Sequence, residues 1–309
     1  MQLGLIGLGR MGDAMRQRLV RAGHEVVGYD RDPDVSDVPD LTSLVSSLAA
    51  PRVVWIMVPA GEATRATVTE LAGLLEPGDL VIDGGNSRFT DDADHEALLA
   101  SRGIGYLDCG VSGGIWGLDN GYGLMVGGRA DLVERAMPLF DALRPEGPRD
   151  EGFVHAGGVG AGHYAKMVHN GIEYGLMQAY AEGWELLGAT DVVTDVDGCF
   201  KAWTRGTVVR SWLLDLLVKA LEQSPGLDGI DPFTPDSGEG RWTLQEAVDH
   251  AVPMPVTAAA LFARFASRQD ASPTMRMVSA LRGQFGGHTV LTTRDTAASA
   301  STIPASDLR

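Results

Sequence analysis

The chain has 309 residues, of which 44% are hydrophobic, and a formal net charge of −16. This length predicts two domains with enough interior to be stable without a disulfide framework. The negative charge argues against nucleic acid and anionic membranes as partners, because a surface of this sign repels both at long range.

The sequence also favours a cytoplasmic location. The apolar run at residues 2–9 is too short and too rich in glycine to span a bilayer or to act as a signal sequence. The two cysteines, Cys109 and Cys199, have no metal-binding spacing and form no disulfide framework, which suits a reducing compartment.

Residues 1–158 alternate short apolar runs with turn residues and helix-like stretches. This alternation predicts an α/β domain with a doubly wound parallel sheet of the Rossmann type. The expected strands are residues 3–6, 25–29, 53–58, 80–83 and 106–109. Glycine pairs at 84–85 and 113–114 lie close behind the last two strands, at the sheet edge where cofactors and substrates bind.

Residues 7–12 match the G-x-G-x-x-G pattern directly after the first predicted strand. Such glycines permit a tight turn and let a pyrophosphate approach the N-terminus of a helix. The alternative is an ordinary glycine-rich turn before a helix. We predict that this turn holds a dinucleotide through Gly7, Leu8, Gly9, Arg10, Met11 and Gly12.

Asp30 ends the next predicted strand, about 20 residues further on, where a carboxylate can accept hydrogen bonds from both ribose hydroxyls. This carboxylate would repel the 2′-phosphate of NADP, whereas the adjacent Arg31 could attract it. Asp32 adds a second negative charge. We therefore expect NAD to be preferred, with some use of NADP.

Strand patterns end near Gly160, and helix-forming residues dominate from there on. We expect an all-α domain over residues 159–296, followed by a flexible tail at 297–309 that is small, polar and without periodicity. Apolar faces around residues 203–221 suggest burial against a second subunit, which predicts a homodimer or a homotetramer.

Five polar residues recur at helical spacing in the first long helix of this domain: Lys166, His169, Asn170, Glu173 and Tyr174. At about 100° per residue they share a stripe about 140° wide. The ordinary explanation is a solvated polar face. The flanking residues are apolar and leave little surface for solvent, so we interpret the stripe as a functional site that combines a base with an acid.

Six segments resemble the 6-phosphogluconate dehydrogenase family. They are residues 82–87 (IDGGNS), 110–114 (GVSGG), 166–175 (KMVHNGIEYG), 237–243 (SGEGRWT), 262–265 (FARF) and 284–289 (QFGGHT). The resemblance covers nearly the whole chain. Because the chain lacks the duplicated helical region of the long members, it is similar to the short branch.

The resemblance implies oxidative decarboxylation of 6-phospho-D-gluconate to D-ribulose 5-phosphate and carbon dioxide. Neutral Lys166 would take the proton of the C3 hydroxyl, and its ammonium would then polarise the 3-keto group. Glu173 would protonate C1 of the enediol. Because a lysine acts where other enzymes use a metal ion, the resemblance implies no metal.

The resemblance also implies the binding residues. The carboxylate and hydroxyls of the sugar acid would be positioned by Asn86, Ser112, Gly113, Gly114, His169 and Asn170. The phosphate would be held by Tyr174, Arg264, Arg282 and His288. Further cofactor contacts would come from Val58, Pro59, Ala60 and Asn86. By analogy with long members, Arg282 and His288 would complete the site of the neighbouring subunit.

The chain departs from the family pattern at three positions. Asp30 stands where NADP-dependent members carry Asn, and Pro59 replaces a common Lys. Ser237 replaces another Lys near the substrate phosphate, which points to weaker binding or to a related substrate whose anion is held differently.

Two other functions share parts of this pattern. A β-hydroxyacid dehydrogenase, such as one acting on 3-hydroxyisobutyrate, would share the glycine turn, the Ser-Gly-Gly segment and the Lys166/Asn170 pair, but it needs neither a second acid nor a second anion clamp. A non-catalytic nucleotide-binding module would lack the base or the acid, and both Lys166 and Glu173 are present.

Overall fold

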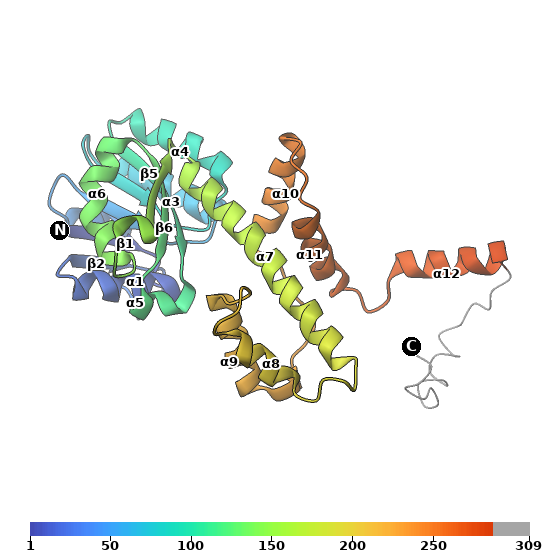
Figure 1. Ribbon diagram of the computed structural model, residues 1–309. Coiled ribbons are helices and arrows are strands. Elements are labelled where there is room, and N and C mark those ends of the chain that lie inside the picture. The colour runs from blue at the N-terminus through green and yellow to red at the C-terminus, as the bar shows by residue number, and fades with distance from the viewer. Residues whose placement is uncertain (287–309) are drawn as a thin grey trace.

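The computed structural model describes residues 1–286, which begin with a seven-stranded sheet and continue as helices around one long helix, α7 (Figure 1). The strands are β1 (Gln2–Ile6), β2 (Glu25–Tyr29), β3 (Val53–Ile56), β4 (Leu80–Asp83), β5 (Gly105–Ser112), β6 (Gly123–Gly128) and β7 (Phe153–Gly157). Their order is β2-β1-β3-β4-β5-β6-β7. The predicted α/β domain of Rossmann type followed by a helical domain is confirmed.

Two strands and one pairing direction were not predicted. Strands β1 to β5 pair in parallel, as predicted, and β6 runs antiparallel to β5, a pairing that the sequence pattern did not indicate. Strand β6 has the sequence GLMVGG, whose three glycines leave too short an apolar run to predict a strand. Strand β7 lies at the sheet edge with Val154 exposed, so it lacks the apolar pattern of a buried strand. Strand β3 ends at Ile56 and not at residue 58.

Helices cover both faces of the sheet, and each face has its own core. The helices of this half are α1 (Arg10–Arg21), α2 (Leu41–Ser46), α3 (Glu62–Leu74), α4 (Phe89–Ala100), α5 (Gly117–Asn120) and α6 (Ala130–Leu143). One core includes Trp55, Met15 and Phe140, and the other includes Ile56 and Leu71. Because both faces are buried, the central strands β3 and β4 are apolar along almost their whole length.

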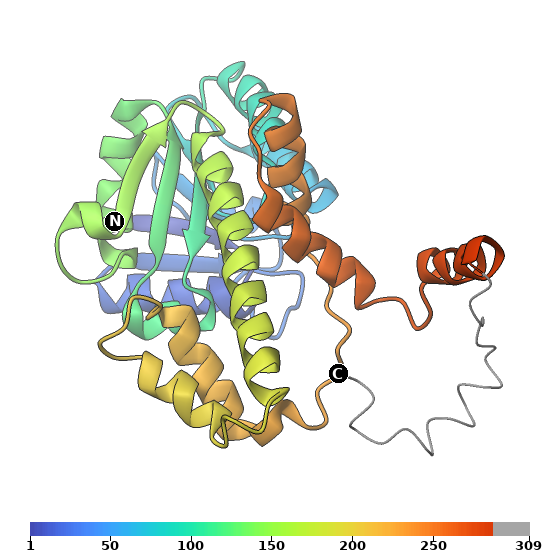
Figure 2. The same ribbon diagram turned by 45° about the vertical axis from the view of Figure 1, so that its right-hand side comes forward.

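The second half consists of α7 (Ala161–Gly188), α8 (Val196–Trp203), α9 (Trp212–Gln223), α10 (Glu239–Asp249), α11 (Pro255–Ala266) and α12 (Pro273–Gly286). Helices α8 and α9 lie on one side of α7, and α10 and α11 lie on the other (Figures 1 and 2). In both views α12 extends away from the rest of the described chain. None of the helices within residues 1–286 combines the length and apolar character that crossing a membrane requires.

The apolar residues of 203–221 divide into two groups. Leu214, Val218 and Leu221 of α9 pack on Phe200 of α8 within the same chain, whereas Val208 and Trp212 are exposed, so burial of this segment against a second subunit stays a prediction. The domain limit at residues 158 and 159 stays a prediction, and the tail at 297–309 lies outside the described residues.

Candidate active site

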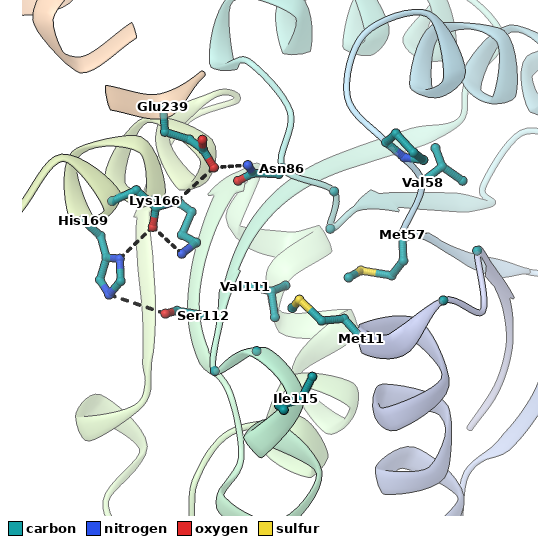
Figure 3. Close-up of a pocket in the computed structure, with 18 of the residues that line it drawn as sticks. Met11, Met57, Val58, Asn86, Val111, Ser112, Ile115, Lys166, His169 and Glu239 are labelled. Atoms are coloured by element: carbon teal, nitrogen blue, oxygen red, sulfur yellow. Dashed lines mark hydrogen bonds between the residues drawn. The ribbon is translucent and has the colours of Figure 1, made fainter. Parts of the chain in front are cut away.

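A cavity of about 1310 Å³ lies between the carboxyl edge of the sheet and the face of α7. Its walls come from the ends of β1 to β5, from the loop after β4, and from α7, α9 and the first residue of α10. Figure 3 shows that residues of both halves of the chain point into this space. Parallel strands bring their carboxyl ends to one edge, which explains why loops far apart in the sequence meet here.

The glycine turn after β1 has the shape that a pyrophosphate requires. Gly7 has a φ of 91°, and a Cβ at Gly12 would collide with the carbonyl oxygen of Gly7. A Cβ at Gly9 would meet nothing within 4 Å, so the backbone beside the N-terminus of α1 is open to a ligand. The turn therefore fits an anionic group at a helix N-terminus.

The predicted turn residues divide into lining and supporting groups. Gly7, Gly9 and Met11 line the cavity, whereas Leu8, Arg10 and Gly12 do not. The backbone N–H of Leu8 instead donates to Asp30 Oδ2 at 2.7 Å. Val58 and Pro59 line the cavity, and Ala60 does not.

Asp30 lies at the cavity wall with its carboxylate held in place. Besides the bond from Leu8, its Oδ1 accepts the backbone N–H of Asp32 at 3.0 Å. Each carboxylate oxygen has a second lone pair, so both can still accept a ribose hydroxyl. Arg31 and Glu70 also line the cavity, so its wall carries both acidic and basic groups.

Four of the five predicted α7 residues share one face of the helix: Lys166, His169, Asn170 and Glu173 line the cavity. Lys166 Nζ donates to Asn170 Oδ1 at 2.6 Å, and His169 Nδ1 lies 3.0 Å from the same oxygen. His169 Nδ1 also lies 3.9 Å from Glu173 Oε2. Burial lowers the pKa of Lys166, while the negative charges of Glu173 and Glu239 act in the opposite direction. A lysine of this kind can lose its proton and act as a base.

The loops facing α7 supply the other predicted substrate residues. Asn86, Ser112, Gly113 and Gly114 all line the cavity. His169 Nε2 lies 3.4 Å from Ser112 Oγ, which joins α7 to the end of β5. Gly113 and Gly114 have φ angles of 145° and 53°, which side chains rarely adopt; a Cβ at Gly113 would press on Tyr122, whereas a Cβ at Gly114 would meet nothing within 4 Å.

Tyr174 and Arg264 lie together but apart from the cavity wall. The guanidinium of Arg264 stacks 3.7 Å from the centre of the Tyr174 ring, and the backbone N–H of Ser237 donates to the Tyr174 hydroxyl at 3.4 Å. Tyr174 is the fifth residue of the predicted stripe, about 80° around the helix from Lys166. At that edge of the stripe α10 and α11 cover it, and it is buried against Leu261.

Of the two other predicted phosphate residues, the structure describes Arg282, which does not line the cavity. Arg282 is exposed on α12, the helix that extends away from the body. His288 lies outside the described residues.

Glu239 is a cavity residue that sequence reasoning did not select. Its Oε1 accepts hydrogen bonds from the side-chain amides of Asn86 and Asn170, the latter at 2.9 Å (Figure 3). Glu239 lies in the segment 237–243 that resembles the family, but neither the pattern nor the resemblance assigned it a role, and an acid at the start of a helix usually serves to stabilise the helix end.

A buried polar network holds the first turn of α7 behind the cavity. Asp108 accepts the backbone N–H groups of Gly160 and His163 at 2.7 and 2.9 Å. His163 Nδ1 donates to Asp92 at 2.9 Å. Burial alone lowers the pKa of His163, but the hydrogen bond and charge of Asp92, with Asp83 and Asp108, outweigh burial and raise the pKa to about 9. The network fixes the helix one turn before Lys166.

The same groups approach metal-binding geometry in two places. Asp83, Asp92 and His95 form one buried set, and Asp92, Asp108 and His163 form the other. Their oxygens are already engaged, since Tyr106 donates to Asp92 at 2.8 Å and Ser87 donates to Asp83 at 2.8 Å. None of these residues lines the cavity, so we assign the network a structural role.

Comparisons with known proteins place this geometry in a family. A family model described as the NAD binding domain of 6-phosphogluconate dehydrogenase matches residues 2–145, and one described as the C-terminal domain of the same enzyme matches residues 162–283. The NAD(+)-dependent, decarboxylating 6-phosphogluconate dehydrogenase of Haloferax volcanii is 42% identical over 300 residues, which cover 94% of this chain and 98% of that protein. The chain belongs to the 6-phosphogluconate dehydrogenase family.

Two further relatives define its place in the family. A putative 6-phosphogluconate dehydrogenase of Bacillus subtilis is 38% identical, with 93% of this chain and 98% of that protein covered. The solved 6-phosphogluconate dehydrogenase of Plasmodium falciparum superposes with a TM-score of 0.79 at 25% identity, covering 94% of this chain but 66% of that longer one. The match in length to the first two relatives agrees with the predicted short branch, and the predicted oxidoreductase class is confirmed.

Proposed function

We propose that this chain catalyses the oxidative decarboxylation of 6-phospho-D-gluconate to D-ribulose 5-phosphate and carbon dioxide. The observation that carries the proposal is the pairing of Lys166 with Glu173 on one face of α7, in the same cavity as the glycine turn and Asp30. A base, an acid and a dinucleotide site within one cavity are the parts that this reaction needs.

Lys166 carries out the first proton transfer. NAD bound against the glycine turn would supply the hydride acceptor. Neutral Lys166 takes the proton of the C3 hydroxyl as hydride leaves C3, which turns this carbon into a ketone. Burial favours the neutral form that this step needs. Asn170 holds the amine through its Oδ1 and thereby orients it.

The same lysine and Glu173 complete the reaction. The ammonium of Lys166 donates its proton to the keto oxygen as the bond to the carboxyl carbon breaks and carbon dioxide leaves with formation of an enediol. Glu173 then gives a proton to the carbon that becomes C1 of the product, and Lys166 takes back the enediol proton. Ser112, His169 and Asn86 line the cavity where they can bind the carboxylate and hydroxyls.

Replacement of each group tests this assignment. Lys166→Met should abolish hydride transfer, because no base remains for the C3 hydroxyl. Glu173→Gln should lower kcat by about 10²–10⁴-fold while a first turnover of NADH still forms in a rapid-mixing experiment, because the acid acts after hydride transfer. A Glu173→Gln variant with wild-type kcat would remove the acid from the mechanism.

The cofactor preference follows from the Asp30 region. We propose NAD as the preferred acceptor, with some use of NADP. The carboxylate of Asp30 is anchored by two backbone N–H groups, so it cannot easily turn away from a 2′-phosphate. Glu70 adds a further acid to the cavity wall, while the adjacent Arg31 acts in favour of NADP. The NAD(+)-dependent relative from Haloferax volcanii supports the same preference.

The phosphate end of the substrate is proposed to use a second subunit. Tyr174 and Arg264 supply a stacked guanidinium from this chain. Arg282, on the extended helix α12, and His288 would reach the cavity of a neighbouring copy in a homodimer or homotetramer. The exposed side chains of Met275, Met277 and Leu281 on α12 are the kind of apolar surface that such an assembly would cover. We also propose a cytoplasmic location for the enzyme.

A further inference from the structure

Glu239 connects the two halves of the chain at the cavity. It is the first residue of α10 and only 2% exposed. The Thr243 hydroxyl lies 2.7 Å from the backbone carbonyl oxygen of Glu239 and 2.9 Å from that of Met167 on α7, and these two acceptors share its single proton. The backbone that carries Glu239 is therefore fixed against α7 next to the turn that carries Lys166.

One oxygen of Glu239 gathers two amides from different parts of the chain. Its Oε1 accepts from Asn86, on the loop after β4, and from Asn170 on α7. A carboxylate is an acceptor only, so it fixes the amide nitrogen of Asn170 toward itself. The Asn170 oxygen is then left facing Lys166 Nζ at 2.6 Å (Figure 3). A protonated lysine also selects the oxygen, but a neutral amine can accept as well as donate, so in that form the Glu239 acceptor helps to keep the Asn170 oxygen, and not its NH₂, toward Nζ.

We propose that Glu239 is a positioning residue that orients Asn170, and through it Lys166, across the junction of the two halves. This inference rests on the proposed function, because it assigns Glu239 a task in the use of Lys166 as a base. Nothing in the proposed chemistry requires Glu239 to touch the substrate.

The charge of Glu239 gives the arrangement a second consequence. The titratable groups of α7 in the same cavity wall are Lys166, His169 and Glu173, and the loop after β4 brings Asn86 to Glu239 and Arg88 to Gln245 of α10 at 3.3 Å. Within residues 1–286 the other oxygen, Oε2, is buried without a hydrogen-bond partner. The negative charge raises the pKa of Lys166 against the effect of burial. Glu239 thus opposes the loss of the lysine proton while it orients the amine.

The pH profile of Glu239→Gln separates these effects from simple support of the fold. Glutamine can still present an oxygen to both amides but carries no charge. The pKa of Lys166 should fall, so the acid limb of kcat/KM for 6-phosphogluconate should move to lower pH, with kcat at alkaline pH close to that of the wild type. Glu246→Gln, a charge-neutralising change two turns along the same helix and outside the cavity wall, is the matched control and should leave the profile in place.

Glu239→Ala removes both the charge and the acceptor. Its kcat at alkaline pH should fall by about 100-fold, the effect of a base displaced by about 1 Å, and Glu239→Gln should rescue it. The binding of NADH, followed by fluorescence, checks that each variant is folded. If Glu239→Ala does not fold, the pH profile of Glu239→Gln is the measurement that tests the inference.

An acid limb that stays in place in Glu239→Gln, with an active wild type, shows that the charge of Glu239 does not act on Lys166 and overturns this part of the inference. A Glu239→Ala variant that is folded and as active as the wild type overturns the positioning role. A wild-type protein that does not oxidise 6-phosphogluconate would instead refute the proposed function, so the two failures are distinguishable.

Discussion

Gly110, within strand β5, lies directly against the helix turn that carries Lys166. A Cβ at this position would collide with Lys166 Cβ and would come within 3.0 Å of Lys166 Cγ and 2.9 Å of the carbonyl oxygen of Gly162. One of these neighbours is backbone, so the strain cannot be relieved by rotation of a side chain alone. Gly110→Ala should therefore push the first turns of α7 away from the sheet.

The size of the effect follows from contact distances. Carbon atoms pack at about 3.5–4.0 Å, so α7 has to move by about 1 Å near Lys166. A displacement of about 1 Å in a reacting group lowers the rate by about 100-fold. Overpacking of this kind also costs about 1–3 kcal/mol of stability. We expect kcat for 6-phosphogluconate to fall by about 100-fold in protein that remains folded at the assay temperature.

The assay combines steady-state kinetics with unfolding in urea. Gly158→Ala is the matched control, because a Cβ at Gly158, just before α7, would meet nothing within 4 Å. Its kcat and stability should stay near those of the wild type. If Gly110→Ala keeps more than half of the wild-type kcat, then close packing of α7 on β5 does not set the position of Lys166.

Three further predictions concern stability, cofactor and assembly. Because the pKa of His163 is raised to about 9 from its ordinary 6.5, its ion pair stabilises the fold fully below pH 6.5, and this contribution should be lost as the pH rises through 9. The free energy of unfolding in urea should fall over this pH range, and the fall should be smaller in Asp92→Asn. A wild-type free energy of unfolding that does not change with pH would count against the ion pair of His163 and Asp92. Asp30→Asn should shift the ratio of kcat/KM values toward NADP, and a wild-type enzyme that prefers NADP would reject the proposed cofactor. A refolded mixture of Lys166→Met and Arg282→Met should regain about a quarter of wild-type activity if Arg282 serves the neighbouring subunit. A mixture of two variants altered in the same α7 should stay inactive, and an active monomer would end the shared-site proposal.

The local parts of the site were open to prediction from the sequence. The roles of Gly7 and Asp30 could be predicted from a strand, a tight turn and a fixed spacing, because all three depend on residues near one another in the chain. The face of α7 with Lys166 and Glu173 follows from helical periodicity alone. The structure brings these residues into one cavity, as the pattern indicated.

The parts that depend on distant contacts were not open to such reasoning. Glu239 lies 69 residues from Asn170 and 153 from Asn86, and only the packing of α10 on α7 brings the three together. Tyr174 has the spacing of a cavity residue, but α11 covers its edge of α7, and Arg264 stacks on its ring. Periodicity gives the direction of a side chain and not the element that packs over it.

The central claim is that this enzyme couples hydride transfer to loss of carbon dioxide from a phosphorylated sugar acid. The direct measurement is the initial rate of NAD reduction with 6-phosphogluconate and, separately, with 3-hydroxyisobutyrate, while carbon dioxide release is recorded. We predict turnover of 6-phosphogluconate with one carbon dioxide released for each NADH formed. NADH formation from 3-hydroxyisobutyrate alone, without carbon dioxide, would contradict the claim and would make the chain a β-hydroxyacid dehydrogenase.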